Sequence, residues 1–203
     1  MKRCFIFGAL PVSALCEKPS PGDMVIAADK GYDTVIGFGL QPDLTVGDFD
    51  SRGKAPATDD LIVLPVRKDQ TDVGYAVEVG FSRGYRDFVV YGGVGGMLDH
   101  TVANIAIAYD IVVRGGSAVF IGEECCFTVI RHGEKTFAAR DRGRLSVFAL
   151  GGTARGVTIR GLGYELDDGK IACTDHIGVS NEFIGKEATI SVKDGDLLII
   201  WQT

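Results

Sequence analysis

The first 123 residues alternate short apolar runs with longer segments of helical periodicity, and this alternation constrains the fold more than any other feature. The apolar runs are predicted strands, at 4–10, 24–29, 44–49, 61–66, 88–93 and 118–122. The intervening segments are predicted helices, at 32–39, 71–84 and 98–116. Strands that are apolar on both faces and joined by helices predict a mostly parallel sheet covered by helices. We therefore expect a Rossmann-like α/β domain over residues 1–123.

Residues 124–203 have a different texture, with short β-type segments separated by glycine or charged turns. The segments at 144–150 and 154–161 are predicted as separate strands, and DDG at 167–169 and KDGD at 193–196 as turns. This pattern predicts a small all-β sandwich or barrel. No low-complexity linker precedes it, so we expect a close junction between the domains 1–123 and 124–203.

Hydropathy and cysteine usage indicate a soluble cytoplasmic protein. Apolar residues make up 46% of the chain, but no run approaches the roughly 20 residues that cross a bilayer. The N-terminal segment resembles a signal peptide only until Pro11 interrupts it, and a first strand is the better interpretation. The five cysteines lack CxxC spacing, which argues against a disulfide framework or a structural zinc site.

The charge distribution argues against nucleic-acid binding. The formal net charge is −6, and residues 1–123 carry 16 acidic and 11 basic side chains. Residues 124–203 are nearly balanced, with 11 acidic and 10 basic side chains. An excess of carboxylates in the first domain favours a metal ion or a cationic ligand over a polyanion.

Acidic residues follow several predicted strands of the first domain. Asp29 follows 24–28, and Asp48 and Asp50 follow 44–47. The segments KDQTD and GGVGGMLDH come after the next two strands. Ligands of open parallel sheets bind outside the carboxyl ends of the strands, so we expect these residues to share one edge of the sheet.

The GDFDS segment predicts part of a magnesium site. In an extended chain, Asp48 and Asp50 would project to the same side, with Cα atoms about 7 Å apart, and Phe49 would point into the core. Two such carboxylates repel each other unless a cation is near, and Mg²⁺ is commonly held by one or two carboxylates with phosphate and water. An Asx-type turn at Asp50, with Asp48 facing solvent, is the alternative.

The next two segments each allow a binding role and a purely structural role. Asp69 and Asp72 would add a third carboxylate to the metal site, or would cap the helix that begins near residue 71. The glycines of 92–96 would let backbone N–H groups approach phosphate, or would form a tight turn. Asp99 is equally a helix cap. Together these features predict a Mg²⁺-dependent enzyme acting on a phosphate-bearing substrate.

The motifs resemble those of the thiamine pyrophosphokinase family, whose members transfer the terminal pyrophosphoryl group of ATP to the thiamine hydroxyl and release AMP. The resemblance runs from about residue 27 to the end and rests on segments in the family's order. These are LQPDLTVGDFDS, KDQTD, GGVGGMLDHTVANI, GYELDDGKI with GVSNEF, and ATISVKDGDLLII.

The resemblance implies a set of site residues. The principal Mg²⁺ ligands would be Asp48, Asp50 and Asp72, with Asp99 also in the catalytic site, and Ser180 and Asn181 would contact thiamine. The expected binding site for Mg²⁺–ATP further includes Asp29, Lys30, Lys68, Asp69, Gln70, Thr71, Gly93, Gly95 and Gly96. The resemblance also implies a homodimer with the active site at the subunit junction.

Two positions depart from the family pattern, Met97 and Lys30, and at Lys30 in AADKG the family often has a glycine. The glycine loop commonly continues as GGRxDH, and Met97 occupies the arginine position here. A guanidinium pairs with phosphate in a bidentate manner, which a thioether cannot do. Lys30 and Lys68 are the candidates for supplying the missing charge.

Two alternative functions stay open at this point. One is a related pyrophosphokinase that acts on a hydroxymethyl-pterin. The other is a non-catalytic sensor of thiamine or nucleotide, although a sensor would not need the complete set Asp48, Asp50 and Asp72.

Overall fold

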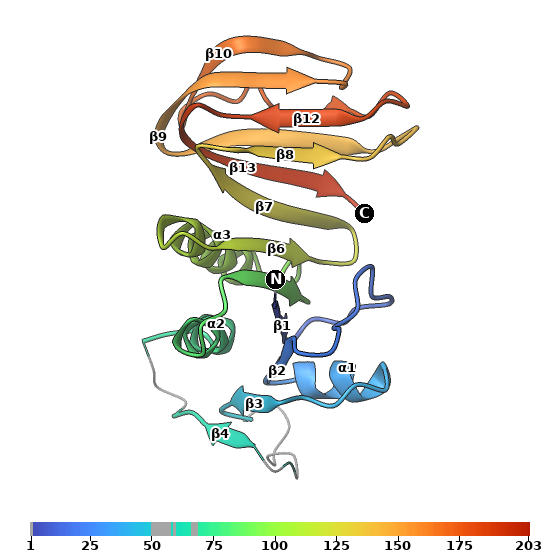
Figure 1. The fold of residues 1–203 in the computed structure, drawn as a ribbon, viewed down its shortest axis with the longest axis vertical. Coiled ribbons are helices and arrows are strands. Elements are labelled where there is room, and N and C mark those ends of the chain that lie inside the picture. Colours follow the sequence, from blue (N-terminus) through green and yellow to red (C-terminus); the bar gives the residue numbers. More distant parts are fainter. Residues whose placement is uncertain (1, 50–57, 59, 66–68) are drawn as a thin grey trace. The chain divides into compact units, whose positions relative to one another are not determined.

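The computed structural model describes residues 2–49, 58, 60–65 and 69–203, so Asp50 and Lys68 lie outside the described residues. The chain divides into two compact units, Met1–Glu123 and Glu124–Thr203 (Figure 1). Helices and strands are both present, which confirms the prediction of a mixed α/β chain. No helix of the described part of the chain is long and apolar enough to cross a membrane.

The first unit is built on a parallel sheet. Its strands are β1 (Cys4–Phe7), β2 (Met24–Ala28), β3 (Leu44–Gly47), β4 (Leu61–Val63), β5 (Asp87–Tyr91) and β6 (Ser117–Ile121). They are ordered β4-β3-β2-β1-β5-β6, and every neighbouring pair is parallel. The order reverses at β1, where one half of the sheet grows toward β2 and the other toward β5. A crevice at the carboxyl ends is expected at such a reversal.

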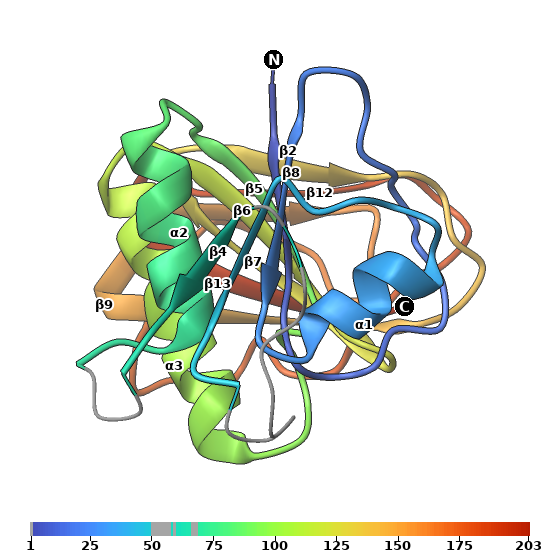
Figure 2. The same cartoon turned by 90° about the horizontal axis from the view of Figure 1, so that it is seen from below.

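In the described part of the first unit, three helices cover this sheet: α1 (Gly31–Gly37), α2 (Asp72–Ser82) and α3 (Leu98–Val113). Helices α2 and α3 lie on one face and α1 on the other (Figure 2). Residues of α2 that face the sheet include Ala76, Val77 and Phe81, all buried. A Cβ at Gly80 would lie 2.5 Å from the Phe88 ring, so glycine permits the close approach of α2 to β5.

The core of the first unit runs along the central strands. All four residues of β1 are fully buried, and Phe88 and Phe120 on neighbouring strands are equally inaccessible. This burial on both faces explains why the strands read as continuous apolar runs rather than as alternating ones. The polar residues are thereby left to the loops at the strand ends.

The second unit contains strands and turns. Its strands are β7 (Cys125–Arg131), β8 (Glu134–Phe137), β9 (Arg144–Arg160), β10 (Leu166–Ala172), β11 (Asn181–Glu182), β12 (Ala188–Ser191) and β13 (Asp194–Gln202). They pair antiparallel in the order β7-β13-β9-β12-β8, and β10 and β11 also pair with β9. An apolar cluster that includes Leu145, Val157 and Leu197 forms its core.

Three predictions about this unit were wrong. Strand β13 begins at Asp194, so most of the predicted turn at 193–196 lies inside it. The segments 144–150 and 154–161 form the single strand β9, because Gly151 and Gly156 take φ values of 66° and 63° that redirect the chain without ending the pairing. The predicted turn at 167–169 lies inside β10, where register shifts against β9 absorb the glycine and the positive φ of Asp168.

Candidate active site

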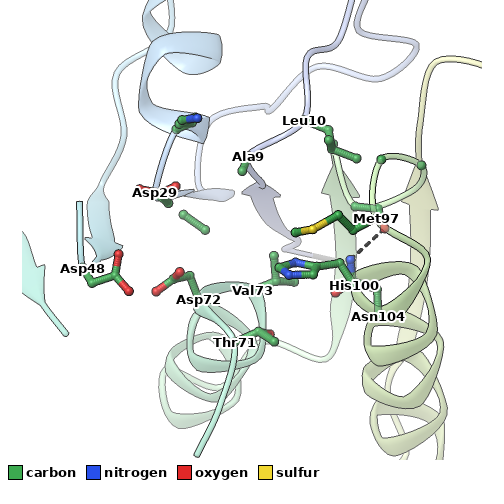
Figure 3. A pocket seen from close by; sticks show the side chains of 16 residues that line it. Ala9, Leu10, Asp29, Asp48, Thr71, Asp72, Val73, Met97, His100 and Asn104 are labelled. Atoms are coloured by element: carbon green, nitrogen blue, oxygen red, sulfur yellow. Dashed lines mark hydrogen bonds between the residues drawn. The ribbon is translucent and has the colours of Figure 1, made fainter. Parts of the chain in front are cut away.

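A cavity of about 680 Å³ opens within the first unit at the carboxyl ends of its strands. The loops after β1, β2, β3 and β5 and the first turns of α2 and α3 all contribute to its lining. Acidic residues lie at one end, and the apolar side chains of Ala9, Leu10 and Met97 lie at the other (Figure 3). The cavity therefore offers a charged region and an apolar region to one elongated ligand.

Three of the predicted aspartates line this cavity: Asp29 after β2, Asp48 after β3 and Asp72 at the start of α2. The carboxylates of Asp48 and Asp72 are directed toward each other (Figure 3). Asp29 has a φ of 50°, and its N–H donates to the Val46 carbonyl at 2.8 Å. The backbone bond fixes the Asp29 turn, and a residue held in this sparsely populated region commonly belongs to a functional site.

The extended geometry expected for GDFDS is wrong. Strand β3 ends at Gly47, and Phe49 has a φ of 54°, which lies in the left-handed region. The chain is not extended through Phe49, so alternation cannot place Asp48 and Asp50 on one side. Phe49 is nevertheless only 2% exposed, which confirms that its ring is buried.

The donor set at the acidic end fits a hard divalent cation. Among the described residues, no group of three His, Cys, Asp or Glu side chains is placed to hold a metal ion. Asp48 and Asp72 facing across a cavity nevertheless match Mg²⁺, which usually takes one or two carboxylates and completes its shell with water and phosphate oxygens. Either residue would thus hold such an ion by an oxygen ligand.

The residues of the KDQTD segment differ in their position relative to the cavity. Asp69 and Gln70 are exposed and do not line the cavity, whereas Thr71 and Asp72 do. The Thr71 hydroxyl accepts a hydrogen bond from the Gly74 N–H at 3.1 Å and caps the helix. Thr71 thus fixes the first turn of α2, on which Asp72 is carried.

The start of α3 also differs from expectation. Asp99 is exposed, and its carboxylate accepts from the His100 N–H at 2.9 Å, while the neighbouring His100 lines the cavity. Met97 precedes the helix, lines the cavity and is 62% exposed. Lys30, which comes just before α1, also lines the cavity and contributes a cationic side chain to it.

The glycine loop between β5 and α3 contributes Gly93, Gly95 and Gly96 to the lining of the cavity. The N–H of Gly95 donates to the Thr101 hydroxyl at 3.2 Å and is therefore already engaged. Among the described residues, the N–H groups of Gly93 and Gly96 meet no hydrogen-bond acceptor. These two glycines are the better candidates for contacting an anion.

Sequence reasoning missed several lining residues, notably Leu10 and Asn104. Asn104 is only 7% exposed, and its side-chain amide donates to the Gly93 carbonyl at 2.7 Å (Figure 3). A polar residue inside an apolar helical stripe was a detectable signal for Asn104. No pattern in the sequence around Leu10 predicts its place in the cavity, because its contact with the glycine loop joins segments far apart in the sequence.

Ser180 and Asn181 lie in the second unit. Ser180 is exposed, with a φ of 60°, and its N–H donates to the Ser146 hydroxyl at 3.1 Å. Asn181 is 6% exposed. Its amide oxygen accepts from the N–H groups of Tyr164 and Glu182, both at 2.9 Å, and its NH₂ donates to the Tyr164 carbonyl at 2.6 Å. The Asn181 amide therefore holds the backbone beside the 76% exposed Tyr164.

Two models of protein families match this chain. Residues 20–120 match the catalytic domain of thiamin pyrophosphokinase, and residues 137–197 match its vitamin B1 binding domain. The thiamine pyrophosphokinase of Bacillus subtilis (strain 168) is 28% identical over 185 residues, which cover 88% of this chain and 86% of that protein.

Solved structures share the fold. The crystal structure of the thiamine pyrophosphokinase from Bacillus subtilis has a TM-score of 0.87 at 24% identity and covers 100% of this chain and 99% of that one. The thiamin pyrophosphokinase from Geobacillus thermodenitrificans has a TM-score of 0.80 at 25% identity, with coverage of 99% and 97%. The chain belongs to the thiamin pyrophosphokinase family.

Proposed function

We propose that this chain transfers the terminal pyrophosphoryl group of ATP to the hydroxyl of thiamine, giving thiamine diphosphate and AMP. The observation that carries the proposal is the pair of facing carboxylates, Asp48 and Asp72, in a cavity that a glycine loop also lines. Carboxylates suit a metal ion, and a glycine loop before a helix suits a phosphate chain. Membership of the family supplies the identity of the acceptor.

Asp48 and Asp72 would hold Mg²⁺, and Asp50 is proposed as a third ligand from the sequence alone. The bound ion would neutralise charge on the phosphate oxygens. Lys30 would add positive charge, and the N–H groups of Gly93 and Gly96 would donate hydrogen bonds to phosphate oxygens. Most of the rate enhancement would come from holding the β-phosphorus in line with the attacking hydroxyl and from electrostatic stabilisation.

The lining of the cavity suggests the remaining contacts with the nucleotide. Its apolar end, formed by Ala9, Leu10 and Met97, would accept the nucleoside, and Asp29 and Thr71 would border the polyphosphate. One carboxylate, Asp72 or Asp99, would accept the proton of the thiamine hydroxyl. Asp72 lines the cavity and Asp99 does not, which favours Asp72. Lys68, Asp69 and Gln70 stay proposals that rest on the family motif.

We assign the thiamine site to the second unit. The match to a vitamin B1 binding domain spans Ser180 and Asn181 and supports this assignment. We further propose that the first unit is a Rossmann-like nucleotide domain and the second a small β-sandwich or barrel. The active form would be a cytoplasmic homodimer in which the second unit of one copy faces the first unit of the other.

The direct test is an assay with defined substrates. The purified chain is incubated with ATP, Mg²⁺ and thiamine, and AMP and thiamine diphosphate are separated by chromatography. We expect equal amounts of the two products, and none when thiamine is omitted or Mg²⁺ is chelated. AMP formed only with a hydroxymethyl-pterin would instead identify the related pyrophosphokinase, and tight binding without AMP would identify a sensor.

A further inference from the structure

The glycine loop is tied to α3 by two side chains one helical turn apart. The Thr101 hydroxyl accepts from the Gly95 N–H and donates to the Gly95 carbonyl, both at 3.2 Å. The Asn104 amide donates to the Gly93 carbonyl at 2.7 Å. Residues three apart lie on the same face of a helix, so Thr101 and Asn104 reach the loop together. They fix its backbone at two points.

Burial makes the Asn104 bond costly to lose. Asn104 shares the buried face of α3 with Ala108, Ile111 and Val112, which are apolar. A buried amide without a partner destabilises the folded state, and the bond to Gly93 satisfies it. A Cβ at Gly93 would lie only 2.9 Å from the Phe120 ring, so the loop sits directly on the core at this point.

The opposite side of the loop rests on Leu10. A Cβ at Gly92 would lie 2.4 Å from the Leu10 carbonyl oxygen, and one at Gly96 would lie 2.8 Å from a methyl group of Leu10. The glycines therefore let the loop fit between Leu10 and α3. Contacts on both sides leave the loop little freedom to move away from the cavity.

We infer that Thr101 and Asn104 are positioning residues that hold the glycine loop in the arrangement required to bind the phosphates of ATP. The inference rests on the proposed function and extends it to residues that fix the loop from α3. The N–H groups of Gly93 and Gly96 have no acceptor in the described part of the chain, so these two are the groups that would contact phosphate. A loop ordered before binding loses less conformational entropy when the ligand arrives.

The test measures nucleotide affinity apart from turnover. The probe is α,β-methylene-ATP with Mg²⁺, titrated calorimetrically, because its α,β bridge resists the cleavage that the proposed reaction requires. Thr101→Val removes the hydroxyl at nearly constant shape and should weaken binding about fivefold, because its two long hydrogen bonds to Gly95 are lost. Thr101→Ser should restore the affinity to within about twofold, and the KM for thiamine should stay unchanged in both variants.

Thr45→Val is the matched control. Thr45 is fully buried on β3, and its hydroxyl has no hydrogen-bond partner in the described part of the chain. The substitution removes a threonine hydroxyl from the same unit without touching the loop, so the affinity for the probe should not change. Asn104→Ala should weaken binding by about tenfold or more, and thermal unfolding shows whether that variant is folded.

The outcomes separate the inference from the proposed function. The inference is supported if Thr101→Val binds the probe more weakly and Thr101→Ser restores the affinity. The affinity of Thr45→Val should equal that of the wild type. Wild-type affinity in Thr101→Val, or an equal loss in Thr45→Val, overturns the inference while leaving the proposed function intact. Failure of the unaltered chain to bind the probe overturns both.

Discussion

In the first unit, Asp48 and Asp72 direct their carboxylates into a cavity, whereas in the second unit the amide of Asn181 makes three hydrogen bonds inside the fold. The difference follows from how each unit fixes its loops. In the first unit, strand ends, glycines and helix first turns set the backbone, and the aspartates line the cavity. In the second unit, a side chain from the predicted site itself sets the backbone. The motif aspartates of the first unit therefore line a cavity, whereas Asn181 in the second unit fixes the geometry of the backbone.

The largest expected effect tests the proposed role of Asp48 as a metal ligand in the first unit. Asp48→Asn keeps the size of the side chain but removes a charged metal ligand, so turnover should fall by at least about 100-fold. The free energy of unfolding should change by less than about 1 kcal/mol, because Asp48 is only half-buried. Product formation and urea unfolding measure the two quantities.

Asp110→Asn is the control for this prediction. Asp110 is an exposed aspartate near the end of α3 that pairs with Arg114 and does not line the cavity. Its substitution should leave turnover unchanged. Near-normal turnover in Asp48→Asn would contradict the assignment of the metal site.

The next effect tests the structural role of Asn181 in the second unit. Asn181→Ala removes three hydrogen bonds from a residue that is 6% exposed, so the second unit should lose about 2–3 kcal/mol of its free energy of unfolding. Trp201 is the single tryptophan and packs edge-on against Phe137, so its fluorescence reports unfolding of this unit.

Asn181→Asp sharpens the same measurement. The carboxylate keeps an acceptor for the N–H groups of Tyr164 and Glu182, but its second oxygen opposes the Tyr164 carbonyl, and its charge lies at a site that is 6% exposed. Its stability should therefore fall at least as far as that of Asn181→Ala. A higher KM for thiamine with unaltered stability in Asn181→Ala would show instead that the amide contacts the substrate directly.

A smaller effect concerns the charge of the cavity. Lys30→Ala should raise the KM for ATP about tenfold, the cost of removing one cation beside a phosphate chain. Lys30 makes no side-chain cap to α1, so its loss should not disturb the helix. Lys30→Arg should recover most of the affinity, and Lys18→Ala, an exposed lysine outside the cavity, should have no effect. An unchanged KM in Lys30→Ala would remove Lys30 from the site.

Local periodicity was enough to predict the strands of the first unit and the cavity position of Asp48 and Asp72. Both follow from short-range patterns, since a buried parallel strand is a continuous apolar run and its polar neighbour falls at the carboxyl end. The contact of Leu10 with the glycine loop was not predictable, because it joins segments about 80 residues apart. The contact is possible only because the glycines have no side chains.

The second unit was harder to predict for a related reason. Gly151 and Gly156 look like turn signals, yet β9 continues through both because β10, β12 and β13 pair along its length. Tertiary pairing thus overrides local turn preference. The internal role of Asn181 is equally nonlocal, since it depends on Tyr164.

The smallest expected effect concerns Ser180 in the second unit. The question is whether this residue both has a strained backbone and contacts thiamine. Ser180 is a non-glycine residue with a φ of 60°, so Ser180→Gly should raise the free energy of unfolding by about 0.5 kcal/mol, whereas Ser180→Ala keeps the strain and should not. Both variants lose the hydroxyl, so a thiamine contact predicts the same rise in KM for each. Equal stabilities would contradict the strain, and an unchanged KM in both would leave Ser180, like Asn181, with a role in the geometry of the loop.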